Sequence, residues 1–197
     1  LYVQQQSGGA TLVGALGATY AVMELFASPV IGALSDRFGR RPVLIACVTG
    51  TMLAYIMLGL AQSLAVIFLA VALDGITGGT LATAYAYVAD VTRPENRARG
   101  MGLVGAAFGL GVIAGPALGG LLSQFGLALP AFIAAGVAGA NVLFGLLVLP
   151  ESLPRERRAA ATPALQTFNW VGQVTNLLRM LPIRRLLLGM FMLNLAF

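Results

Sequence analysis

Two long apolar segments meet at the stretch Gly32-Ala33-Leu34-Ser35-Asp36-Arg37-Phe38-Gly39-Arg40-Arg41-Pro42. The segments are residues 10–34 and 43–60, and each is long enough to cross a hydrocarbon core of about 30 Å as a helix. Gly39 permits the positive φ of a tight turn, and Pro42 suits the first turn of a helix. The stretch therefore predicts a charged turn between two membrane-spanning helices.

Three more apolar segments follow, at residues 64–89, 101–122 and 129–149, and another begins at residue 186. The chain is 58% hydrophobic and 10% charged, whereas a soluble domain has about 25% charged residues. The pattern predicts an all-α membrane protein with five complete transmembrane helices and the start of a sixth. The chain opens at Leu1 without a signal-peptide pattern, and we expect both ends to be truncated.

The twelve basic residues, all arginines, lie in the connections after the first, third and fifth apolar segments. The intervening connections, residues 61–63 and 123–126, carry no charge. By the bias that orients membrane helices, we expect the arginine loops to be cytoplasmic and the protein to be a multi-pass component of the cell inner or plasma membrane. Arginines confined to such loops indicate orientation in the membrane, so we expect no nucleic-acid partner.

Histidine is absent from the sequence, and Cys47, the one cysteine, lies within an apolar segment. The sequence therefore lacks the residues needed for a zinc site or for a Cys/His nucleophile pair. A glycine run at residues 109–115 lies inside an apolar segment with no preceding strand, which excludes a dinucleotide loop. We expect no enzyme activity, no metal and no cofactor.

An internal repeat relates the ends of the first and fourth apolar segments at a shift of 87 positions, from Ala27 to Ala114. The matched residues are Ala27, Pro29, Gly32, Leu34, Phe38 and Gly39 in one copy and Ala114, Pro116, Gly119, Leu121, Phe125 and Gly126 in the other. Three membrane crossings separate the copies, so the repeat is inverted, as within one half of some transporter folds. Chance matching of small residues is the alternative.

The stretch at residues 32–42 resembles the signature loop between helices two and three of the major facilitator superfamily. The resemblance implies a cytoplasmic gating motif, in which a charge latch helps to hold the outward-facing state. Its residues are Gly32, Asp36, Arg37, Gly39, Arg40 and Arg41, completed by Asp90. The alternative is that the arginines only orient the loop, but it does not explain the presence of Asp36 and Asp90.

Gly111, Gly115 and Gly119 share one helical face, where small residues let another helix approach, and Pro116 should bend the segment. Together with Gly120, they resemble the antiporter motif of helix five in the drug/proton antiporter branch of that superfamily, with tetracycline-type efflux proteins nearest. Generic helix packing is the alternative. The chain departs from the family at Val71, where an arginine tied to proton transfer is common.

Glu24 and Asp74 are the acids placed well inside apolar segments. Because an acid near the bilayer centre costs about 2.5–3.5 kcal/mol, we expect both side chains to face other helices or an aqueous cavity. Asp74 is the candidate for proton transfer, since in the family its helix lines the central cavity. Glu24 is the candidate for recognising a cationic substrate. A plain hydrogen bond to a neighbouring helix is the alternative for each.

The resemblance implies that the chain is divided into three parts. Residues 1–150 are a partial N-terminal bundle of family helices two to six without helix one, residues 151–185 are a central cytoplasmic loop with an amphipathic segment, and residues 186–197 begin family helix seven. The implied function is proton-coupled efflux of a small amphiphilic, drug-like compound by alternating access. The alternatives are a uniporter or nutrient symporter of the same family, and a channel or structural membrane protein. The implied partners are the substrate, protons, the lipid bilayer, and the missing helix one and C-terminal half.

Overall fold

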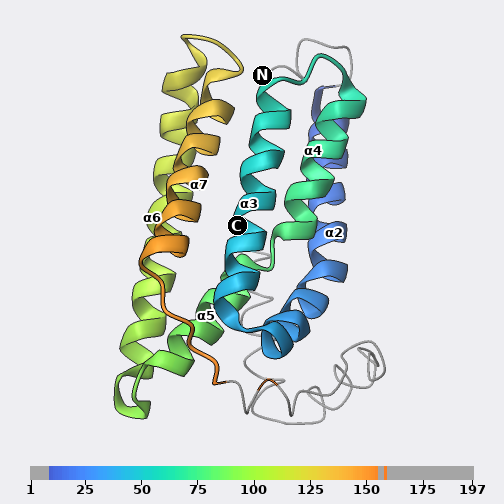
Figure 1. Ribbon diagram of the computed structural model, residues 1–197. Coiled ribbons are helices and arrows are strands. Elements are labelled where there is room, and N and C mark those ends of the chain that lie inside the picture. The colour runs from blue at the N-terminus through green and yellow to red at the C-terminus, as the bar shows by residue number, and fades with distance from the viewer. Residues whose placement is uncertain (1–8, 155–157, 159–197) are drawn as a thin grey trace, which may run out of the picture. The chain divides into compact units, whose positions relative to one another are not determined.

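The computed structural model describes residues 9–154 and 158, which form a helical bundle (Figure 1). The helices are α2 (Gly9–Phe38), α3 (Arg40–Gly59), α4 (Leu64–Thr77), α5 (Thr80–Val91), the short 3₁₀ helix η1 (Pro94–Asn96), α6 (Arg97–Ser123) and α7 (Leu129–Leu147). Counting α4 with α5 and η1 with α6, five segments are long and apolar enough to cross a membrane. The five predicted spans are confirmed. The segment from residue 186 and the amphipathic segment lie outside the described residues.

α3 lies in the middle of this bundle, between α7 on one side and α4 on the other, and α2 packs on α4 (Figure 1). Small residues fill the contacts: Ala54 of α3 and Ala70 of α4 are 1% and 2% exposed. Gly139 and Gly145 of α7 lie against side chains of α3. Such small residues let neighbouring helices approach closely. In a lipid environment, this close packing of helices stabilises the bundle.

The single helix expected over residues 64–89 is interrupted at Gly78 and Gly79, between α4 and α5. The Gly78 N–H donates to the Gly75 carbonyl at 3.1 Å, which is a tighter turn than the α-helix makes. A Cβ atom at Gly79 would lie 2.9 Å from the Ile31 side chain of α2. The expectation of one continuous helix is wrong because two weak helix formers coincide with a close contact from α2.

The two copies of the internal repeat share two backbone features. α2 contains Pro29 and α6 contains Pro116, and each helix leads into a glycine with positive φ. These glycines are Gly39, with φ of 110°, and Gly126, with φ of 152°, and within the described residues no others have positive φ. α2 and α6 run in opposite directions (Figure 1). A proline within the helix and a glycine of positive φ at matched positions support an inverted repeat, although α6 ends two matched positions earlier than α2.

Candidate functional site

Arg40 is the centre of a charge cluster where α2 meets α3, which we call the arginine-rich end of the bundle. Its Nη2 lies 2.7 Å from Asp36 Oδ1, and its Nε lies 3.1 Å from Asp90 Oδ2. Its Nη1 donates to the hydroxyl of the fully buried Ser35 at 2.7 Å. The Asp36 side chain is 55% exposed and that of Asp90 20%, so water screens the contact with Asp90 less. The structure brings the three charged residues of the expected latch together.

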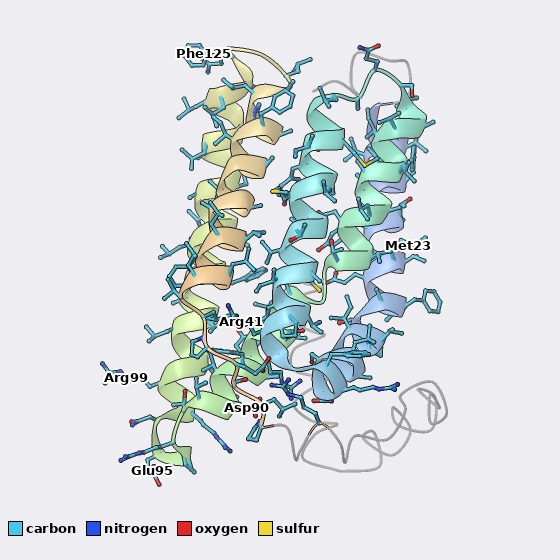
Figure 2. All side chains as sticks on the ribbon, viewed as in Figure 1. Met23, Arg41, Asp90, Glu95, Arg99 and Phe125 are labelled. Carbon is cyan, nitrogen blue, oxygen red and sulfur yellow. The ribbon has the colours of Figure 1, made fainter. Side chains whose placement is uncertain are left out.

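The other arginines of the motif have different partners. Arg41 donates from Nε to the Gly145 carbonyl at 3.2 Å and from Nη2 to the Leu146 carbonyl, so it joins α3 to the end of α7. Arg37 is exposed, with its guanidinium 5.4 Å from the centre of the Phe38 ring. Figure 2 shows Arg41 and Asp90 at the arginine-rich end, far from Phe125 at the opposite end. Arg41 therefore holds helices together rather than completing the charge cluster.

Sequence reasoning missed two charged residues at this end, Glu151 and Arg158. The Glu151 carboxylate accepts a hydrogen bond from the Arg40 backbone N–H at 2.9 Å, and Arg158 Nη2 lies 3.4 Å from the same carboxylate. Glu151 is an acid directly after an apolar segment, in a connection otherwise rich in arginine. This contrast with the surrounding arginines is the sequence feature that could have identified Glu151 as a candidate.

Glu24 and Asp74 lie on the adjacent helices α2 and α4, within their apolar length, and both are partly buried. Glycines bring these helices close: a Cβ atom at Gly78 would lie 3.2 Å from Glu24 Cγ and 3.2 Å from Tyr20 Oη. The two carboxyl groups are near enough to interact electrostatically. The structure therefore places both predicted acids at one helix–helix contact.

Several hydroxyl groups lie in the same region as the two acids. The Thr77 hydroxyl donates to the Asp74 backbone carbonyl at 3.1 Å, and its Oγ1 lies 3.2 Å from Thr51 Oγ1. The Tyr20 and Tyr55 hydroxyls are in the same region. We call these six residues the polar cluster: Tyr20, Glu24, Thr51, Tyr55, Asp74 and Thr77. A hydroxyl both donates and accepts hydrogen bonds, so such a set can carry a proton or bind a polar group. The arginines of residues 9–154 all lie in the connections or at helix ends, and none reaches this cluster.

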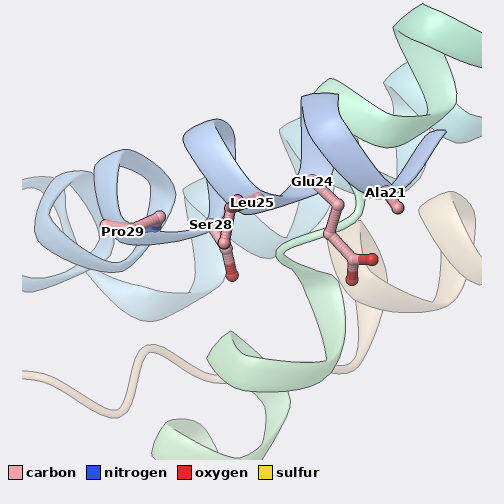
Figure 3. Close-up of a pocket in the computed structure, with 5 residues that line it drawn as sticks. All are labelled: Ala21, Glu24, Leu25, Ser28 and Pro29. Atoms are coloured by element: carbon pink, nitrogen blue, oxygen red, sulfur yellow. The ribbon is translucent and has the colours of Figure 1, made fainter. Parts of the chain in front are cut away.

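The Glu24 side chain also borders an open hollow of about 530 Å³ on the surface of α2. Figure 3 shows the carboxyl group of Glu24 and the hydroxyl group of Ser28 projecting from the same side of the helix. The other lining residues, Ala21, Leu25 and Pro29, are apolar or small. The hollow thus places one acid and one hydroxyl beside apolar or small side chains, and all five lining residues belong to α2.

The family model of the Major Facilitator Superfamily matches residues 1–197. The chain belongs to the Major Facilitator Superfamily. It is 43% identical over 165 residues to the class C tetracycline resistance protein of Escherichia coli, which covers 82% of this chain and 42% of that protein. It is 34% identical over 157 residues to human major facilitator superfamily domain-containing protein 10, covering 80% of this chain and 34% of that protein.

Among solved structures, the chain is similar to the crystal structure of the human organic anion transporter MFSD10 (TETRAN). The TM-score is 0.68 at 35% sequence identity, covering 74% of this chain and 33% of that one. The chain thus spans less than half the length of these relatives. The Major Facilitator Superfamily fold and the five apolar helices make it part of a multi-pass integral membrane protein.

The glycine-rich motif of this superfamily member lies on α6, which runs without interruption through Pro116. Within the described part of the chain, no atom of another element lies within 4 Å of a Cβ atom built at any of its four glycines, which are Gly111, Gly115, Gly119 and Gly120. α2–α5 and α7 therefore do not pack on this face. Close packing of another helix at the motif stays a prediction.

Proposed function

We propose that this chain is part of a proton-coupled exporter of small amphiphilic, drug-like compounds, working by alternating access in the cell inner or plasma membrane. The arginine-rich end then faces the cytoplasm, as the charge bias of the connections favours. Membership of the Major Facilitator Superfamily and similarity to tetracycline resistance proteins support an exporter. The alternating-access mechanism needs family helix one and a second bundle, so we expect this chain alone to move no substrate.

The polar cluster is the observation that carries the proposal. It has one acid on α2 and one on α4, where these two helices pack together, near hydroxyl groups and away from the described arginines. Buried charge needs a counter-charge, and either a proton or a cationic substrate can neutralise a carboxylate. If the two compete for the same pair of acids, uptake of a proton displaces the substrate. Such competition is sufficient to couple export to proton entry.

The charge cluster at Arg40 gives the second element, a gate. Its ion pairs join the end of α2 and the start of α3 to the end of α5, so they close only when these helix ends are together. We assign the outward-facing state to the closed cluster. Residues 151–185 are then the central cytoplasmic loop, and residue 186 begins the second bundle.

The test uses the full-length transporter in membrane vesicles, with the variants Asp74→Asn and Glu24→Gln. Efflux driven by a pH gradient and substrate exchange without a gradient are measured for each. We expect Asp74→Asn to lose gradient-driven efflux and retain exchange, because exchange requires no net proton movement. We expect Glu24→Gln to weaken the binding of cationic substrates in both assays.

The matched control is Glu95→Gln, which neutralises an exposed acid at the arginine-rich end. It should behave as the unmodified transporter does. Normal coupling in both Asp74→Asn and Glu24→Gln would reject the assignment. Loss of both activities in Asp74→Asn, with normal folding, would move Asp74 from proton transfer to substrate binding.

An organic anion is the second candidate substrate, because the chain resembles a human organic anion transporter in sequence and fold. The charges of the polar cluster disfavour it, since both ionisable carboxyl groups would repel an anion. Competition of unlabelled cationic and anionic compounds against a labelled substrate distinguishes the two classes.

A further inference from the structure

The residues that follow α7 close over the turn between α2 and α3. Glu151 Oε1 accepts hydrogen bonds from the backbone N–H groups of Arg40 at 2.9 Å and Leu153 at 3.1 Å. Glu151 Oε2 lies 3.4 Å from Arg158 Nη2, and Arg158 Nη1 donates to the Phe38 carbonyl at 3.2 Å. Arg158 also donates from Nε and Nη2 to the Leu153 carbonyl at 2.9 and 2.7 Å. We call Glu151 and Arg158 the post-α7 pair.

Each member of the pair lies at a helix end of opposite polarity. Arg40 is the first residue of α3, and Phe38 is the last residue of α2. Helix ends leave N–H groups unpaired at the start and carbonyl groups unpaired at the finish, with partial charges of opposite sign. The anionic Glu151 contacts the start of α3 and the cationic Arg158 contacts the finish of α2. Both side chains are about three-quarters buried, with exposures of 24% and 23%.

Gly39 is the residue over which Glu151 fits. Its φ of 110° and ψ of 153° fall in a region that is essentially restricted to glycine. A Cβ atom at this position would also overlap Glu151 Oε2 and lie 2.8 Å from Glu151 Cδ. Gly39 is therefore needed by the turn itself and by the carboxylate that packs on it.

We propose that Glu151 and Arg158 are positioning residues of the gate. By holding the first N–H of α3, Glu151 fixes the backbone from which the Arg40 side chain reaches Asp36 and Asp90. Arg158 holds the other side of the same turn. The segment leading out of α7 then sets how stably the charge cluster closes, and moving that segment would shift the balance between inward- and outward-facing states. The proposal rests on the gating role assigned to the cluster.

The test measures this balance in the full-length transporter. Ser28 borders the hollow beside Glu24, so Ser28→Cys, in a background without other reactive cysteines, reports from which membrane side an impermeant thiol reagent reaches it. The ratio of labelling from the two sides is compared for Asp36→Asn, Glu151→Gln, Arg158→Gln and the control Glu95→Gln. The amide variants of Asp36, Glu151 and Glu95 keep the size of the side chain and remove its charge, whereas Arg158→Gln removes the charge and shortens the side chain.

We expect Glu151→Gln and Arg158→Gln to move the ratio in the same direction as Asp36→Asn, by about tenfold, which corresponds to about 1.4 kcal/mol. The double variant Asp36→Asn/Glu151→Gln should shift it little beyond Asp36→Asn alone, because both residues act through Arg40. Glu95→Gln should leave the ratio unchanged.

Three results would overturn the proposal. If the ratio is unchanged in Arg158→Gln and Glu151→Gln but shifts in Asp36→Asn, the post-α7 pair has no role in gating, while the gating role of the charge cluster stands. Fully independent effects in the double variant exclude action through Arg40. If the ratio is unchanged in every variant, including Asp36→Asn, both the gating role of the charge cluster and this proposal are rejected. If Glu151→Gln folds poorly, Arg158→Gln alone decides.

Discussion

A substitution at Gly75 tests the close contact between α2 and α4 that brings Glu24 and Asp74 together. A Cβ atom at Gly75 would lie 2.7 Å from the Tyr20 carbonyl oxygen and 2.8 Å from Met23 Cβ. Ordinary contacts of a Cβ atom are 3.4–4 Å. A backbone oxygen cannot rotate away, so Gly75→Ala must push the helices apart by several tenths of an ångström.

The expected cost follows from two opposing terms. Adding a methyl group to a tightly packed contact costs about 1–3 kcal/mol, whereas replacing glycine by alanine within a helix gains about 0.5–1 kcal/mol. The matched control is Gly136→Ala in α7, where nothing in the described residues lies within 4 Å of the added Cβ. The helix term cancels between the two variants, so they should differ in unfolding free energy by about 1–3 kcal/mol.

The assay compares the thermal unfolding midpoints of the two full-length variants in the same detergent. Gly75→Ala should unfold at a lower temperature than Gly136→Ala and should lose gradient-driven transport, because the two acids are displaced from each other. Equal midpoints would refute the close approach of α2 and α4 at this point. A lower midpoint with normal transport would refute the functional importance of the contact.

Three further predictions concern the two ends of the bundle. Arg41→Ala should lower the unfolding midpoint because two carbonyls at the end of α7 lose their donor, while the exposed Arg37→Ala should leave it nearly unchanged; equal effects would contradict the reasoning. Gly39→Ala and Gly126→Ala should both cost about 1–3 kcal/mol in backbone strain, but a labelling assay of the two membrane sides should show a shifted conformational balance only for Gly39→Ala. Asp36→Asn should reduce transport in vesicles with near-normal expression, because partly exposed ion pairs contribute only about 0–1 kcal/mol to stability; unchanged transport would make Asp36 an ordinary loop residue.

The membrane spans could be predicted from the sequence because the length of an apolar segment alone decides whether it can cross a bilayer. The break between α4 and α5 could not. Gly78 and Gly79 weaken a helix by about 1 kcal/mol each, which many membrane helices tolerate. The contact of Ile31 with Gly79 marks the break, and that contact depends on how α2 is placed.

The charge cluster was predictable to different degrees for its different members. Asp36 and Arg40 are four positions apart, on the two sides of the turn at Gly39, so their contact is local in the sequence. Asp90 is 50 positions from Arg40 and was identified through the family resemblance. Glu151 is 111 positions from Arg40, and no local pattern marks it as a partner. Long-range contacts of this kind require the packing of α7 against α3.

The inverted repeat separates what the fold supplies from what the charged residues add. Gly39 and Gly126 are matched glycines of positive φ at opposite ends of the bundle. At Gly126 the space for a Cβ atom is open within the described residues, whereas at Gly39 the Glu151 carboxylate occupies it. Within the described residues, the charge cluster and the post-α7 pair lie at one end only, so the proposed gate depends on residues that the matched end at Gly126 lacks.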